Sequence, residues 1–256
     1  FALLPAIAVI VYDEVQFRRR IFQAIHRETV RIGAMAQERI ESLIEQSRAE
    51  LRTLSHMNEI QAMNASSSER LAEVLSDEDI FTNLAIADPS GKIVCSAIPF
   101  QGEVRFEGVE SFKTAVATGA FSVGKYHFNP ISHKPGLDLA CPLRDRQGKL
   151  SGVLVASLGF GWLGDFTARA DLPKEAALVV LDSDGVILAR TLEPGKWVGK
   201  SVREAPFVQN VLRAAHAGTA TIRGFDGIDR LYAYAPIRIG ATEANAFLAV
   251  GIPTTV

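Results

Sequence analysis

An internal repeat constrains the fold of this chain more than any other feature of its sequence. Residues 84–97 and residues 178–191 each contain an apolar run, an Asp-x-x-Gly turn and a second apolar run. Aspartate and glycine favour tight turns between strands, so each segment predicts a β-hairpin. The two segments start 94 residues apart. Self-similarity at a fixed offset indicates two copies of one structural unit.

Three further pairs of elements recur in the same order at nearly the same offset. They are a short helix ended by glycine (111–119 and 206–218), a strand with a proline-apolar pair (137–143 and 231–237) and an apolar strand (152–158 and 247–252). We therefore predict an α+β fold, in which a long N-terminal helix precedes two tandem units. Each unit, at about 80–165 and 175–256, has a five-stranded antiparallel sheet with flanking helices.

Residues 14–64 predict one long helix. Their apolar residues recur mostly at steps of three, four or seven, which is the spacing of one helical face. Gly33 lowers the stability of such a helix by about 1 kcal/mol relative to alanine. Two helices with a break near Gly33 therefore remain the alternative. A helix of about 50 residues spans roughly 75 Å and must lie along other elements or pair with another helix. Ser67 or Ser68 is then expected to cap a short helix at 69–75.

The first residues suggest a membrane. The chain begins with Phe1 rather than Met, and residues 1–12 carry no charge. A spanning helix needs roughly 20 apolar residues. We therefore expect residues 1–12 to be the partial end of a transmembrane segment, because Asp13 and the arginines 18–20 follow directly. An apolar core segment is the alternative, and a signal-peptide core is a third interpretation.

Composition and motifs exclude several classes of function. Apolar residues make up 48% of the chain and charged residues 22%, which is typical of a globular protein. A net charge of -2 offers no basic field to a nucleic acid, so we predict no nucleic-acid partner. The sequence has no nucleophile-elbow, zinc-protease or phosphate-loop motif. We predict no catalytic residue and no cofactor, and the scattered histidines and two cysteines predict no metal site.

Polar side chains gather in the predicted hairpin of the first unit, between residues 124 and 138. Hydrogen-bonding groups are offered there by Lys125, Tyr126, His127, Asn129 and Ser132. The corresponding segment of the second unit, 219–231, has only one aromatic residue. We therefore expect the first unit to hold a ligand at these residues, and a solvated hairpin is the alternative.

Asp138 differs from its neighbours because it interrupts an apolar strand. It lies between Leu137 and Leu139, so we expect it to face inward and to need a partner. An amine or hydroxyl group of a ligand would serve, and so would Lys125 or Arg105.

The order of these features resembles that of a double Cache sensor module, over about residues 15–256. The resemblance rests on the long helix and two PAS-like units, on residues 122–126 and 134–135, on Pro142-Leu143, on the turn at 145–148 and on 152–162. It implies the extracytoplasmic part of a bacterial transmembrane receptor in the cell membrane, exposed to the periplasm or extracellular space. A sensor histidine kinase is expected first, then a diguanylate cyclase or a chemoreceptor.

The resemblance also implies a division of labour. Residues 13–64 form a stalk helix, residues 65–170 form a membrane-distal unit that binds the ligand, and residues 171–256 form a membrane-proximal unit that passes the signal on. Phe112 matches an aromatic ligand position of amino-acid-binding members, but the arginine and tryptophan of that motif are absent. Arg105, Lys125 and His127 therefore favour a carboxylate.

Three classes of function remain after these steps. We expect a sensor that binds a small molecule (an amino acid, organic acid or amine) and forms a homodimer through its N-terminal helix. A ligand-free structural dimerisation ectodomain is the first alternative. A small-molecule enzyme is the second, and it would need two facing titratable groups that the sequence does not show.

Overall fold

The computed structural model describes residues 3–77, 79–161, 175–214, 216–237 and 246–254. Side chains at 126 and 127 lie outside this description, as do those up to residue 29 except Gln23 and Arg27. The boundary expected at residues 170 and 171 also lies outside the described residues.

The first part of the chain consists of three helices followed by a unit with a complete antiparallel sheet. Its elements are α1 (Leu3–Ser55), α2 (Asn58–Gln61), α3 (Ala65–Asp77), β1 (Phe81–Ala87), β2 (Ile93–Ser96), α4 (Glu110–Thr118), β3 (Ser122–Phe128), β4 (Pro135–Arg144) and β5 (Leu150–Leu158). The strand order is β2-β1-β5-β4-β3. This order places the hairpin β1–β2 at one edge and β3 at the other.

The second unit repeats this arrangement. Its elements are β6 (Ala177–Asp182), β7 (Ile187–Arg190), α6 (Pro194–Trp197), α7 (Pro206–Leu212), β8 (Gly218–Arg223), β9 (Asp229–Ile237) and β10 (Ala246–Pro253). The strand order β7-β6-β10-β9-β8 is that of the first sheet. The register repeats too, since Ala85 pairs with Ser96 in the first sheet and Val179 with Arg190 in the second. The predicted α+β fold with two tandem sheets is confirmed.

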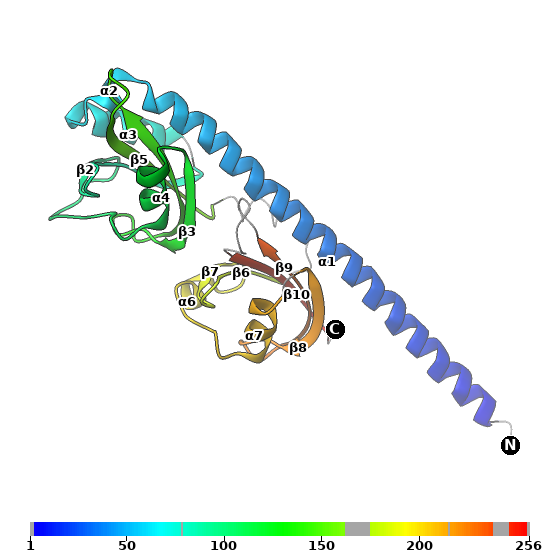
Figure 1. The fold of residues 1–256 in the computed structure, drawn as a ribbon. Coiled ribbons are helices and arrows are strands. Elements are labelled where there is room, and N and C mark those ends of the chain that lie inside the picture. The colour runs from blue at the N-terminus through cyan, green and yellow to red at the C-terminus, as the bar shows by residue number, and fades with distance from the viewer. Residues whose placement is uncertain (1–2, 78, 162–174, 215, 238–245, 255–256) are drawn as a thin grey trace.

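One continuous apolar core joins α1 to both units. Figure 1 shows α1 running past the two sheets, with the first unit at the end far from the N-terminus. Apolar residues of β1, β2, β4 and β5 and of β6, β7, β9 and β10 face α1 and form one cluster with Ile40, Leu43 and Leu51 of that helix. The opposite faces are covered separately, by α4 in the first unit and by α7 in the second. Both cysteines, Cys95 and Cys141, are buried on the α1 side of the first sheet.

The helices differ from the predictions in three details. First, α1 has no break at Gly33, and it ends at Ser55 rather than at residue 64, where the N–H groups of His56 and Met57 donate to carbonyls three residues back (3.2 and 3.0 Å). Second, α3 begins earlier than predicted, since Asn64 Oδ1, and not Ser67 or Ser68, accepts the Ser66 N–H (2.9 Å).

The third difference concerns the glycines that were expected to end two helices. Gly119 does end α4, in the left-handed conformation (φ 64°). Gly218, by contrast, is the first residue of β8, because α7 already ends at Leu212. Within the part of the chain described here, no helix has an apolar stretch that could cross a bilayer.

Candidate functional site

Three polar side chains form a row across the middle of the first sheet. Asp138 on β4 and Asn83 on β1 both pair in register with Ser157 on β5, the strand between them. All three are on the face toward α4, and each is at most 1% exposed. Strand alternation explains this placement, since Leu137 and Leu139 take the α1 side and leave Asp138 on the other. The expectation that Asp138 faces inward is confirmed.

A directed chain of hydrogen bonds ends at Asp138. The amide of Asn129 donates to the Ser157 hydroxyl (2.7 Å), and that hydroxyl donates to the Asp138 carboxylate. Asn129 is itself fixed, because its carbonyl oxygen accepts the N–H groups of Ile131 (2.9 Å) and Ser132 (3.0 Å). The hairpin after β3 is thereby tied to the centre of the sheet.

Several buried polar atoms near this row have no hydrogen-bond partner among the described residues. They are Asn83 Nδ2, Ser111 Oγ on α4 and Ser132 Oγ in the β3–β4 turn. Asn83 Oδ1 is satisfied, because it accepts from Ser96 at 3.2 Å. Unsatisfied buried polar groups are uncommon in folded proteins, since each costs about 1–3 kcal/mol. Their presence in the layer around α4 indicates a place where another molecule can supply the missing bonds.

The structure brings some of the predicted ligand residues to this layer. Phe112 is 4% exposed and packs beside Phe106 in the apolar cluster under α4. Asn129 and Ser132 lie there as described above. Tyr126 and His127 are on β3, paired with Leu137 and Gly136, but their side chains lie outside the described residues.

The two predicted cations lie elsewhere. Arg105 bonds to Glu103 (2.9 Å) and Glu107 (3.0 Å) at the surface, and these carboxylates raise its pKa above the usual value. Lys125 pairs with Glu110 at 3.4 Å, with both side chains more than half exposed. The structure therefore does not bring Arg105 or Lys125 to Asp138, whose described partner is Ser157.

The second unit has different residues at the positions of the polar row. Ala177, Gly251 and Tyr232 are paired with one another as Asn83, Ser157 and Asp138 are in the first unit. The Tyr232 ring covers Gly251, where a Cβ atom would lie 2.4 Å from Tyr232 Cε1. Tyr232 also stacks on Phe207 of α7, with ring centroids 3.8 Å apart. Aromatic rings thus occupy the positions that the polar row has in the first unit.

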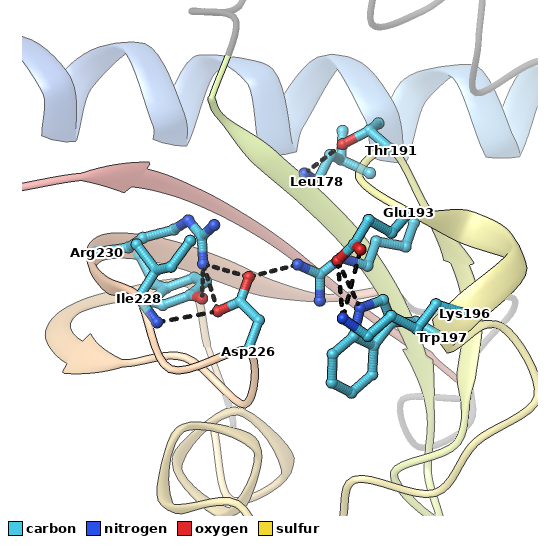
Figure 2. Close-up of polar contacts among 10 residues, drawn as sticks. Leu178, Thr191, Glu193, Lys196, Trp197, Asp226, Ile228 and Arg230 are labelled. Atoms are coloured by element: carbon cyan, nitrogen blue, oxygen red, sulfur yellow. Dashed lines mark hydrogen bonds and ion pairs between the residues drawn. The ribbon is translucent and has the colours of Figure 1, made fainter.

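A buried charged cluster completes this interior (Figure 2). Asp226 accepts from Arg190 (2.6 Å) and from Arg230 (2.7 Å), and the two arginine side chains are 2% and 1% exposed. Trp197 and Phe225 lie against the Arg190 guanidinium, at 5.2 and 4.6 Å. Burial alone would raise the pKa of Asp226, but the bonds from Arg230 and Arg190 outweigh it and hold that pKa below 3.8.

Sequence reasoning missed Asn83, Ser157, Arg190 and Arg230. The signal that identified Asp138, a polar residue within or beside an apolar strand, was present for all four. Asn83 also needed the structure, because a register irregularity between Phe81 and Asn83 decides which face it takes.

Comparison with known proteins identifies the family. The family profile described as Cache domain matches residues 14–255, so the chain belongs to the Cache domain family in its double form. The predicted resemblance is confirmed. Cache domains are sensor domains, so the chain is a sensor domain rather than a catalytic one. No curated protein matches the chain.

Solved structures share the fold at low identity. The extracellular ligand-binding receptor from Desulfohalobium retbaense is 16% identical with a TM-score of 0.66, and the match covers 87% of this chain and 40% of that one. This chain therefore spans about 40% of that receptor's length.

Two other solved structures match over most of both chains. The extracellular domain of rpHK1S-Z16, assigned as a histidine kinase, is 17% identical with a TM-score of 0.55 and 88% coverage of each chain. The ligand-binding domain of the Pseudomonas fluorescens chemoreceptor CtaA, in complex with L-serine, is 13% identical with a TM-score of 0.61. That match covers 91% of this chain and 99% of that one.

Proposed function

We propose that the first unit binds a small molecule between its sheet and α4 and that the chain is the sensor of a transmembrane receptor. The observation that carries this proposal is the row Asn83–Ser157–Asp138 together with buried donors that have no partner among the described residues. The second unit, whose equivalent space is filled by Tyr232 and Phe207, transmits the signal.

The chemistry of the row favours a ligand with a cationic or hydroxyl donor. Asp138 supplies a buried carboxylate that attracts an ammonium group, and Asn83 Nδ2 donates to an acceptor of the ligand. An amino acid or an amine fits both, whereas the surface positions of Arg105 and Lys125 leave little support for the organic acid expected earlier. L-serine in the CtaA domain is a ligand of this class.

Transmission is proposed to run through α1. This helix packs on β4 and β5 of the first sheet and on β9 and β10 of the second, so a shift of about 1–2 Å on ligand binding would be felt by both units. We place the first unit distal and the second proximal to a bacterial cell membrane, exposed to the periplasm or extracellular space, with a histidine kinase as the first choice of output and a chemoreceptor or diguanylate cyclase next. Pairing of two copies through α1 is part of this proposal, and light scattering of the purified chain tests it.

A thermal-shift screen of the chain with amino acids, amines and organic acids tests ligand binding. A ligand at 100 times its dissociation constant stabilises the folded state by about 2.7 kcal/mol, which raises the melting temperature measurably. We expect a hit that Asp138→Asn abolishes and that the matched control Asp229→Asn, an exposed carboxylate of the second unit, retains. A folded sample with no hit would favour the structural dimerisation ectodomain.

A further inference from the structure

A cleft lies on the opposite side of the first sheet from the polar row. It has a volume of about 560 Å³ and is bounded by the last turns of α1, the α4–β3 turn and the β4–β5 turn. Its apolar wall is formed by Phe121, Cys141 and Pro142. Cys141 belongs to the core on the α1 side, whereas Asp138 faces α4, so the sheet itself separates this cleft from the polar row.

Positive charge is concentrated in this cleft. Four arginines line it, together with His56: Arg48, Arg52, Arg144 and Arg146. The lining includes a single carboxylate, Asp145, whose Oδ1 already accepts two turn N–H groups at 2.9 Å. Glu45 pairs with Arg48 at 3.3 Å and adds a second negative charge nearby. The excess of cations contrasts with the whole chain, whose net charge is -2, and clefts lined by one sign of charge focus the field on small ions.

Two of the guanidinium groups are held in place by the protein. Arg144 donates to the carbonyl oxygens of Gly119 (3.0 Å) and Gly148 (2.9 Å), which fixes its plane. Arg48 lies over the Phe121 ring, 4.7 Å from the centroid. Ordering these side chains in advance lowers the entropy that binding would otherwise cost.

The other two guanidinium groups have their donors available. Neither Arg52 nor Arg146 forms an ion pair within the part of the chain that the structure describes, and both side chains are exposed. The cleft thus combines two oriented cations with two that are free to close on a ligand.

We propose that this cleft binds a small multivalent anion, a compound with two or more carboxylate or phosphate groups. The planar fork of each guanidinium matches both kinds of group with paired hydrogen bonds. More than one anionic group is required because the free donors come from different elements, Arg52 from α1 and Arg146 from the β4–β5 turn. A bound anion would therefore tie α1 to the first sheet and bias the same helix that the ligand of the polar row is proposed to move.

Isothermal titration calorimetry of the whole chain with citrate and with pyrophosphate tests the proposal, at about 10 mM and about 150 mM salt. We expect saturable binding of one anion per chain, weakened about tenfold by Arg52→Gln and by Arg146→Gln. The matched control is Arg213→Gln, an exposed arginine of the second unit, and it should bind as tightly as the unchanged chain.

The two probes separate the carboxylate from the phosphate class. A stronger response to citrate assigns the cleft to polycarboxylates, and a stronger response to pyrophosphate assigns it to phosphate compounds. The proposal is overturned if neither probe binds at the lower salt concentration. It is also overturned if all three variants bind alike, because the heat would then come from general screening of surface charge.

Discussion

The two units share one fold and one register but differ in the layer between the sheet and the short helices. In the first unit this layer contains Asp138, which accepts from Ser157, and polar atoms of Asn83, Ser111 and Ser132 that the described residues leave without partners. In the second unit aromatic rings and the Asp226 cluster fill the same layer. The sides that face α1 are alike, since both contribute to one apolar core.

This difference shows which side of each sheet the fold requires to be apolar and which side is able to vary. The α1 side of each sheet must stay apolar because both units pack on the same helix. Among the described residues, the opposite side is covered by elements of the same unit, so its residues can change from one unit to the other without disturbing the common core. A duplicated unit can thus keep its place in the molecule while the residues of this layer differ between the copies, polar in the first and aromatic and charged in the second.

The largest expected effect comes from removing the carboxylate of the second unit. Asp226→Ala leaves two buried guanidinium groups without their shared partner, and breaking a buried ion pair costs about 3–5 kcal/mol of stability. We expect a loss of this size in urea unfolding, and Asp229→Ala, an exposed site, should change stability by less than about 0.5 kcal/mol. Equal losses of stability in the two variants would contradict the conclusion that Asp226 stabilises the second unit by pairing with both arginines.

The pH dependence of stability gives an independent check on Asp226. Its folded pKa is lower than the unfolded value of 3.8, so its ionised form is favoured by folding. The stabilisation is present above the unfolded pKa and is lost as pH falls through the folded pKa. Asp226→Ala should remove this loss of stability at low pH. If the variant still loses the same stability as the pH falls, other carboxylates cause the loss.

A smaller effect is expected from giving the second unit the serine of the first. Gly251→Ser places a Cβ atom 2.4 Å from Tyr232 Cε1 and 2.8 Å from Arg230 Cδ, so the ring and the arginine stem must move. Overpacking of this kind costs about 1–3 kcal/mol. Thermal unfolding measures the loss, and an unchanged melting temperature would show that the interior of the second unit accommodates the added side chain without strain.

The smallest effect concerns the two Asp-x-x-Gly turns. In the first turn the Ser90 hydroxyl bonds to Asp88 (2.6 Å) and lowers its pKa below 3.8. In the second turn burial raises the pKa of Asp182, and the like charge of Asp184 adds to the rise. Because the folded pKa of Asp182 is raised, its ionisation costs stability above that pKa, and the cost is relieved as pH falls toward 3.8.

Asp184→Ser makes the second turn like the first. We expect the pKa of Asp182 to fall in an NMR titration of its carboxyl carbon, because the like charge is removed, while Asp88 serves as the unchanged internal control. A constant pKa at Asp182 would mean that burial alone sets its value.

Much of the fold could be predicted because the repeat presents the pattern of each element twice in the sequence. The D-x-x-G hairpins and the later strands appear where their spacing placed them. The prediction for Gly218 was wrong because a glycine beside a helix can equally begin a strand, and only the packing of α7 decides. At the site, Asp138 was identified by alternation alone, whereas Ser157 and Asn83 matter through cross-strand pairing that no single segment reveals.

The two buried cysteines give the first unit a built-in chemical reporter. Cys95 donates to the Asn64 carbonyl at 3.3 Å, Cys141 lies beneath the end of α1, and burial raises the pKa of both thiols. Cys95 is 1% exposed, so a thiol reagent reaches it only when the helical layer lifts from the first sheet, whereas Cys141 also borders the cleft at the end of α1. The second unit has no cysteine. The labelling rate of Cys95, divided by that of the unfolded chain, therefore measures how often α3 separates from the first sheet, with no engineered cysteine.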